Sequence, residues 1–314
     1  MLFLLPAGTL AQSQTPDSAL SYFEHGNKKY NHGDLDGAIK DFTQAIEISS
    51  RPALSKLQSK RSPIGANSFS ASDDEVSNIN VIDPFTAHAL TSRGLAFVKK
   101  KDFEHAFADF NRAIGINPGL AEAYVDRGGV RYAQGDGEGA LSDWNRAIQI
   151  NSKLVAAYIN RGASFIQMGK IDAAFSDLDQ AIALSPNEAK AYGHRGFAWM
   201  IRKDFDRAIA DFNMAIKLDS GLAWIFEGRG AARMARNELE PAIADLNHAL
   251  ELDPGLAVAY LNRGLAFLVQ GKESEAVRDF EHAQEINPDL QSELNKLFEA
   301  AHGSPRKRVT IEPN

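Results

Sequence analysis

Residues 121–154 read AEAYVDRGGVRYAQGDGEGALSDWNRAIQINSKL, and residues 155–188 read VAAYINRGASFIQMGKIDAAFSDLDQAIALSPNE. The two stretches align without a gap, because an Arg-Gly pair and two alanines, twelve and nineteen residues after the glycine, fall at the same places. The same register extends to six consecutive units with a period of 34 residues, whose glycines are Gly94, Gly128, Gly162, Gly196, Gly230 and Gly264. Gly26 begins the same pattern further upstream. A fixed period of this length predicts a repeat architecture, here with seven units.

Each unit contains two stretches with helical spacing. In residues 121–154, Tyr124 and Gly128 are four residues apart, as are Ala140 and Trp144, so each pair shares one face of a helix. The glycine of the first helix and the alanine of the second allow the two backbones to approach closely. Between the helices we expect a turn residue in the left-handed conformation, an assignment that suits glycine and asparagine better than lysine. The residues at this turn position are Gly33, Lys101, Gly135, Gly169, Lys203, Asn237 and Gly271.

These residues and their spacing resemble the tetratricopeptide repeat (TPR) family over residues 19–52 and 87–290. The resemblance implies an all-α fold, a right-handed superhelical solenoid of helix-turn-helix hairpins. It also implies a concave groove lined by the first helix of each hairpin, and a protein-binding scaffold rather than an enzyme. We therefore expect no catalytic residues, no metal site and no cofactor.

The chain departs from the family pattern at two positions, where relatives have leucine before the glycine and often an aromatic residue fifteen after it. Here an arginine precedes the glycine in six units, and an aspartate follows it by fifteen residues in all seven. We predict an Arg–Asp ladder between paired helices, with a structural role, because a feature repeated in every unit suits a stacking rule. The alternative is a charged binding strip. The arginines are Arg93, Arg127, Arg161, Arg195, Arg229 and Arg263, and the aspartates are Asp41, Asp109, Asp143, Asp177, Asp211, Asp245 and Asp279.

If the arginines are paired inside the stack, Arg161→Ala strands a charge and lowers the melting temperature clearly. An unchanged melting temperature would place this arginine in solvent.

The remaining segments do not follow the repeat. Residues 1–14 hold an apolar run that ends in small residues, which resembles the second half of a secretory signal peptide. Export to the periplasm or secretion is therefore expected, and the alternative is an apolar tail on a cytoplasmic protein.

Residues 53–86 form a polar, serine-rich insertion that we expect to be disordered, either a decayed repeat or a lid over the groove. Residues 291–302 are predicted to form a capping helix, and residues 303–314 a flexible basic tail.

The composition narrows the class of partner. The net charge is −7, from 34 Lys+Arg against 41 Asp+Glu, which disfavours a broad nucleic-acid footprint. The apolar run near the N-terminus is too short to span a membrane. The chain has no cysteine, which excludes disulfides, thiolate metal sites and a thiol nucleophile. The partner is thus expected to be a protein or peptide segment, and the sequence leaves the oligomeric state open.

The groove positions that vary between units are the candidates for specificity. By analogy with the family, they lie two, three and six residues before the glycine. An aromatic anchor beside polar groups suits peptide binding, although Trp224 can equally serve only to pack the stack. The candidates are Asp126, Asn160, Lys190, His194, Trp224, Glu227 and Asn262. A second hypothesis is an assembly component that works through the ends or edges of the stack.

Overall fold

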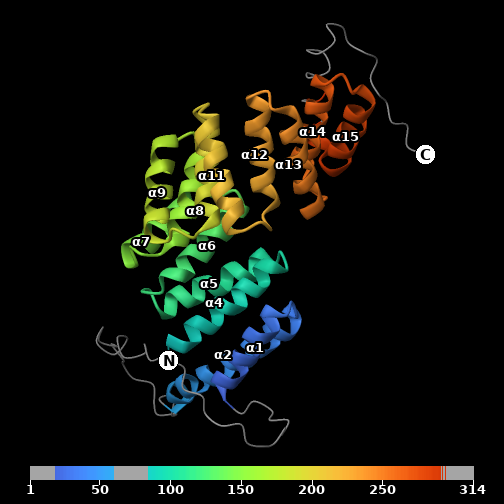
Figure 1. Ribbon diagram of the computed structural model, residues 1–314. Coiled ribbons are helices and arrows are strands. Elements are labelled where there is room, and N and C mark those ends of the chain that lie inside the picture. The colour runs from blue at the N-terminus through green and yellow to red at the C-terminus, as the bar shows by residue number, and fades with distance from the viewer. Residues whose placement is uncertain (1–17, 60–83, 291, 293, 295–314) are drawn as a thin grey trace, which may run out of the picture. The chain divides into compact units, whose positions relative to one another are not determined.

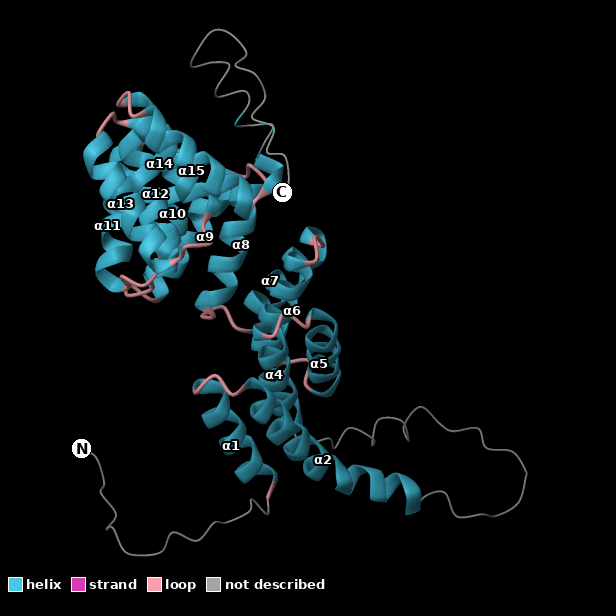
Figure 2. Cartoon of the chain, turned by 90° about the vertical axis from the view of Figure 1, so that its right-hand side faces the viewer, coloured by secondary structure: helices cyan, strands magenta, loops and turns pink. Residues whose placement is uncertain are grey.

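The chain folds into antiparallel helical hairpins (Figure 1). The computed structural model describes residues 18–59 and 84–290, together with 292 and 294. Figure 2 shows helices joined by loops, and the described ranges contain no strand. The helices are α1 (Ala19–Asn31), α2 (Leu35–Ser59), α4 (Pro84–Lys99), α5 (Phe103–Ile116), α6 (Ala121–Ala133), α7 (Gly137–Ile150), α8 (Val155–Gln167), α9 (Ile171–Leu184), α10 (Ala189–Ile201), α11 (Phe205–Leu218), α12 (Ala223–Ala235), α13 (Leu239–Leu252), α14 (Ala257–Val269), α15 (Glu273–Ile286) and the 3-10 turn η2 (Pro288–Leu290).

The hairpins stack in two compact units, residues 1–157 and 158–314, each of which we describe by itself. In the first unit α1 pairs with α2, α4 with α5 and α6 with α7. Helix α2 also packs on α4, and α5 on α6. In the second unit α10 pairs with α11, α12 with α13 and α14 with α15, while α9, α11 and α13 each pack on the first helix of the following hairpin. The predicted all-α class of stacked helical hairpins is confirmed.

In each hairpin the glycine of the first helix lies against a large apolar side chain of the second, which is an aromatic ring in most hairpins and Leu178 or Leu246 in two. A Cβ atom on Gly94 would lie 2.6 Å from Cε1 of Phe110, and one on Gly128 would lie 2.5 Å from Nε1 of Trp144. The glycine of the first helix therefore makes room for the large apolar side chain sixteen residues later. Phe110 and Trp144 are buried, at 0% and 2% exposure. The shared register of the sequence is thus a packing rule.

The turn between paired helices has the same backbone conformation in every hairpin. The turn residue has a positive φ at all seven predicted positions, including Lys101 (φ 61°) and Lys203 (φ 59°). A non-glycine residue there costs roughly 1–2 kcal/mol, so packing of the two helices must outweigh local preference at the lysines. An aspartate then starts the next helix in several hairpins. Asp136 accepts a hydrogen bond from the Gly139 amide at 2.8 Å, for example.

The predicted disordered insertion over 53–86 is wrong at both ends. Helix α2 continues to Ser59, and α4 already begins at Pro84. Five other hairpins end their second helix at an asparagine or aspartate whose side-chain oxygen accepts from the amide two residues later, as Asn117 does from Gly119, and one ends at Ser185, just before Pro186. The first hairpin has Ser49 and Ser50 at those places, and both hydroxyls donate to the Ile46 carbonyl inside the helix. Neither serine provides such an acceptor and no proline directly follows Ser49, so the helix continues. Residues 60–83 lie outside the described residues.

The end segments are described only in part. The predicted signal peptide at 1–14 and tail at 303–314 lie outside the described residues. So does the predicted capping helix at 291–302, apart from residues 292 and 294. Leu294 is 2% exposed and packs in a cluster with Leu261 and Phe280. This side chain thus covers apolar surface of the last hairpin, as a capping segment must.

Candidate functional site

The arginine before the glycine makes a two-pronged ion pair with the aspartate of its own hairpin. Nε and Nη2 of Arg195 donate to the two carboxylate oxygens of Asp211, both at 2.8 Å. The same geometry, with distances between 2.5 and 2.9 Å, occurs in five other hairpins: Arg93–Asp109, Arg127–Asp143, Arg161–Asp177, Arg229–Asp245 and Arg263–Asp279. The paired aspartates are buried, at 3% to 7% exposure. Such bidentate pairs are among the stronger charge-assisted hydrogen bonds.

Within each compact unit, the remaining guanidinium nitrogen joins an arginine's hairpin to the preceding one. Nη1 of Arg127 donates to Asn111 at 2.6 Å, and Nη1 of Arg263 donates to Asn247 at 2.7 Å. Nη1 of Arg195 donates to Asp179 at 2.7 Å. One arginine thus holds three helices, which supports the structural interpretation of the ladder over a charged binding strip.

A second cation supports the aspartate in some hairpins, and sequence reasoning missed it. The position three residues after the glycine holds Arg131 and Arg233, whose Nη1 atoms donate to Asp143 at 2.9 Å and to Asp245 at 2.7 Å. In the first hairpin Lys29 lies 2.8 Å from Asp41. That hairpin has no arginine before its glycine, so the lysine replaces the missing cation. The sequence shows a basic residue at this position in three units and an aromatic residue in the other four, so the signal was weak.

The groove candidates of the second unit form two contacts between neighbouring first helices. In the first, Trp224 of α12 stacks on His194 of α10, with ring centroids 4.9 Å apart and planes at 25°. Phe197 of α10 also stacks with Trp224, at 5.9 Å. A side chain at position 193 would collide with the indole, so Gly193 creates the space for it. Sequence reasoning missed Gly193 and Phe197, since their role depends on which helices adjoin.

His194 and Lys190 belong to the same face of α10, one turn apart. Burial, together with the charge of Lys190, lowers the pKa of His194 to about 4. The imidazole is therefore neutral at physiological pH and stacks on Trp224 as an uncharged ring. Lys190 itself is exposed. The structure thus brings Lys190, His194 and Trp224 into one cluster.

The second contact links Glu227 of α12 with Asn262 of α14. Nδ2 of Asn262 donates to Oε1 of Glu227 at 2.6 Å. Glu227 is 9% exposed, and its burial raises the pKa of the carboxyl group to about 7, while the hydrogen bond from Asn262 works in the opposite direction. The hydrogen bond from Asn262 thus offsets only part of the free-energy cost of burying the Glu227 carboxylate.

Two candidates lie apart from these contacts. Asn160 is half-buried on α8, and Asp126 is half-buried on α6 of the first unit. Burial, with a smaller effect of the Glu122 charge, raises the pKa of Asp126 to about 7.

The raised pKa of Asp126 predicts a fall in stability with rising pH. Between the unfolded pKa near 3.8 and the folded pKa near 7, the folded state binds the proton more tightly, so stability is lost as the pH rises through this window. The full effect corresponds to about 4 kcal/mol, and solvent screening at a half-buried site reduces it to roughly half. Asp126→Asn should reduce the fall in stability that urea unfolding measures between pH 5 and pH 8, and the remaining fall belongs to Glu227, whose pKa is also raised by burial to about 7. The exposed Glu104→Gln is the control, and equal pH profiles for both variants would contradict the assignment.

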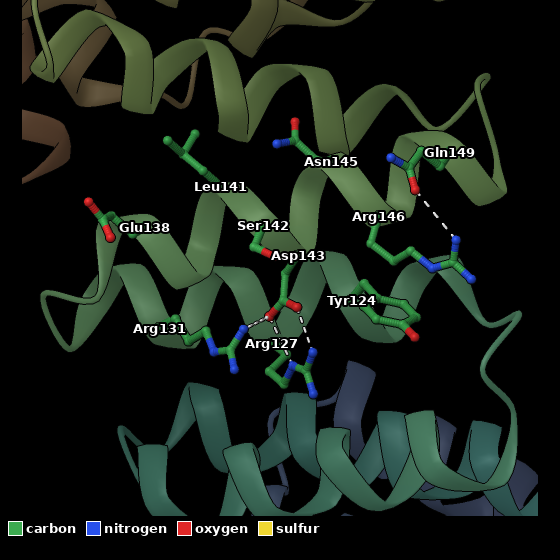
Figure 3. A pocket seen from close by; sticks show the side chains of 10 residues that line it. All are labelled: Tyr124, Arg127, Arg131, Glu138, Leu141, Ser142, Asp143, Asn145, Arg146 and Gln149. Atoms are coloured by element: carbon green, nitrogen blue, oxygen red, sulfur yellow. Dashed lines mark hydrogen bonds and ion pairs between the residues drawn. The ribbon is translucent and has the colours of Figure 1, made fainter.

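An open pocket of about 780 Å³ lies on the α6–α7 hairpin (Figure 3). In Figure 3, Arg127 and Arg131 both point toward Asp143. Asn145, on its rim, takes the place that Asn111 has on the preceding hairpin, where it accepts the hydrogen bond from the next hairpin's arginine. Its lining residues are Tyr124, Arg127, Arg131, Glu138, Leu141, Ser142, Asp143, Asn145, Arg146 and Gln149.

The described residues offer no group of three or more histidine or acidic side chains arranged to hold a metal ion. Among the helices of the described chain, none combines the length and the apolar character needed to cross a bilayer.

Family models match most of the predicted repeats. A model described as TPR repeat matches residues 128–169 and 230–271. Two models described as tetratricopeptide repeat match residues 159–223, and residues 87–120 and 257–290. A search of curated proteins finds no match.

Solved structures agree in fold at low sequence identity. A tetratricopeptide repeat protein from Parabacteroides merdae is 20% identical, with a TM-score of 0.61, and the alignment covers 90% of this chain and 99% of that one. A chain of the APC/C hetero-tetramer Cut9–Hcn1 is 17% identical, with a TM-score of 0.66 over 90% of this chain and 55% of that one. The pilF protein of Pseudomonas aeruginosa is 17% identical, with a TM-score of 0.58 over 68% and 96%. From the repeat register, the hairpin stack and the matching family models together, we conclude that this chain belongs to the tetratricopeptide repeat family.

Proposed function

We propose that the chain is a non-enzymatic scaffold that binds an extended or helical segment of another protein along the first helices of its second unit. The observation that carries the proposal is the cluster of Lys190, His194 and Trp224 on adjoining first helices. A half-buried aromatic ring beside an exposed lysine has the character of a binding hot spot.

The groove positions differ from the arginine ladder in that they vary between hairpins, and this variation supports the same surface as the binding site. The arginines of these helices are held by buried aspartates and by the preceding hairpin, as Arg195 is by Asp211 and Asp179. The positions around them differ from hairpin to hairpin, so that Lys190, Trp224 and Val258 occupy equivalent places. Uniform stacking with a varied groove surface suits selective recognition of one partner segment.

The test is affinity capture with the full chain, followed by a measured Kd for each captured protein. The groove variant Asn160→Ala, Lys190→Ala, Trp224→Ala should bind the partner at least about tenfold more weakly. A matched variant on the second helices, Gln180→Ala, Met214→Ala, Lys217→Ala, changes similar side chains that are exposed on α9 and α11. It should bind as the original chain does.

The two variants also test the competing function. A partner that still binds the groove variant would instead support an assembly component that acts through the ends or edges of the stack.

We also propose that the protein is exported, on the basis of residues 1–14. Capture from envelope extract but not from cytoplasmic extract is the expected result.

A further inference from the structure

Glu227 occupies a position that holds an aliphatic side chain in three other hairpins and no charged residue in any other hairpin of residues 87–290. The residue three positions before the glycine is Val125, Ile159 or Leu261 in three other hairpins, with exposures of 6%, 5% and 7%. In α12 the same position carries a carboxylate at 9% exposure. Burying a carboxylate costs free energy unless it is paired, so this residue contradicts the packing rule of its own repeat. Departures of this kind are expected at functional positions.

The surrounding groups leave the carboxylate without a counter-charge. Within the described chain its hydrogen-bond partner is the Asn262 amide, a neutral group. The nearest basic residues along α12 and α14 are committed elsewhere: Arg229 and Arg233 donate to Asp245, and Arg263 donates to Asp279. Glu227 is thus a buried acid that has an oriented hydrogen bond and lacks an ion pair.

Apolar side chains lie one helical turn from Glu227 and from its hydrogen-bond partner. Trp224 lies one helical turn before Glu227 on α12, and its ring extends over α10 through the stacks with His194 and Phe197. On α14, Val258 lies one turn before Asn262 and is 46% exposed. An acid with an aromatic and an aliphatic residue one turn away on neighbouring helices suits lysine or arginine, which bury an apolar stem and carry a charge at its end.

We propose that Glu227 receives a lysine or arginine side chain of the bound partner segment, so that the partner is basic at the point where it crosses α12 and α14. The inference rests on the proposed function, because it names the chemistry of the segment in the same groove. Asn262 orients the carboxylate, and the burial of Glu227 strengthens an ion pair made there. The occupant is a segment of another protein, chosen by charge complementarity.

The test uses a random peptide library displayed on phage, selected against the immobilised full chain. Selected peptides should share a lysine or arginine at one position. Glu227→Gln removes the charge while keeping an oxygen that accepts from Asn262, so it should weaken a selected peptide by about tenfold. Replacing the peptide's basic residue by methionine should weaken binding to the original chain similarly, and should have little further effect on the Glu227→Gln variant. Glu281→Gln, an exposed acid on α15, is the control and should bind normally.

Other outcomes separate this inference from the function on which it rests. Selected peptides that lack a shared basic residue, or additive effects of the two changes, would overturn the role of Glu227 and leave the groove scaffold intact. Failure to enrich any peptide, or equal binding to the triple groove variant, would overturn the groove scaffold itself.

A second variant checks that the carboxylate is not simply structural. Glu227→Leu installs the residue found at position 261, and replacing a buried charge by an apolar side chain is often neutral or stabilising. We expect a melting temperature at or above that of the original chain, together with loss of the preference for basic peptides. A chain that unfolds on this change would show that Glu227 serves the fold and would overturn the proposal.

Discussion

Replacing Arg263 with alanine is expected to destabilise the chain by roughly 3–5 kcal/mol. The arginine donates to both oxygens of Asp279, which is 4% exposed, and to Asn247 of the preceding hairpin. Without it, the buried carboxylate keeps its charge and loses its counter-ion. Urea unfolding followed by circular dichroism measures the loss. The same argument applies to Arg161, which pairs with Asp177 through Nε and Nη2.

Arg229→Ala is a matched control for this result. Arg229 makes the equivalent bonds to Asp245 and Asn213, but Asp245 also accepts from Arg233 at 2.7 Å. The second cation stays in place when Arg229 is removed, so the cost should be smaller by roughly 2 kcal/mol. Equal losses for the two variants would show that the stranded charge is not the cause. The hydrogen bonds between hairpins would then account for the destabilisation.

The second large effect is expected at Gly128, where alanine should cost roughly 2–4 kcal/mol. The added Cβ would lie 2.5 Å from Nε1 of Trp144 and 2.9 Å from Cδ1. The indole would have to move, and its buried N–H would lose the hydrogen bond that it donates to the Val125 carbonyl at 3.2 Å. Thermal unfolding of Gly128→Ala should therefore show a clear drop in melting temperature.

The neighbouring glycine provides a control of opposite sign. A Cβ on Gly129 would meet nothing within 4 Å, and the residue lies inside α6. Alanine is the better helix former, so Gly129→Ala should stabilise the chain by roughly 0.5–1 kcal/mol. Destabilisation by both substitutions would mean that helix α6 needs its glycines for a reason other than the approach of Trp144.

The hairpin architecture could be predicted because one packing rule repeats. The glycine, the large apolar residue sixteen positions later and the Arg–Asp pair each recur in a fixed register, so six units supply the same information several times. The end of α2 could not be placed in this way. Its boundary was taken from the period, whereas the actual end depends on local capping, which Ser49 and Ser50 do not provide.

The sequence could predict which positions belong to the candidate site, but not which of those residues contact one another. The groove positions follow from the register, but the partners across hairpins do not. Glu227 meets Asn262 rather than Lys190 or His194, because the residue three before one glycine faces the residue two before the next. The stack of Trp224 on His194 depends on the missing side chain at Gly193, which is informative only when the neighbouring helix is known.

The most direct test of the groove scaffold is amide hydrogen exchange of the full chain, with and without a peptide selected from the random library. A ligand in the groove should slow exchange in the first helices α10, α12 and α14. It should leave the exposed faces of α11, α13 and α15 unchanged. Protection confined to the second helices, or to the ends of the stack, would contradict the account and assign the binding surface to another face.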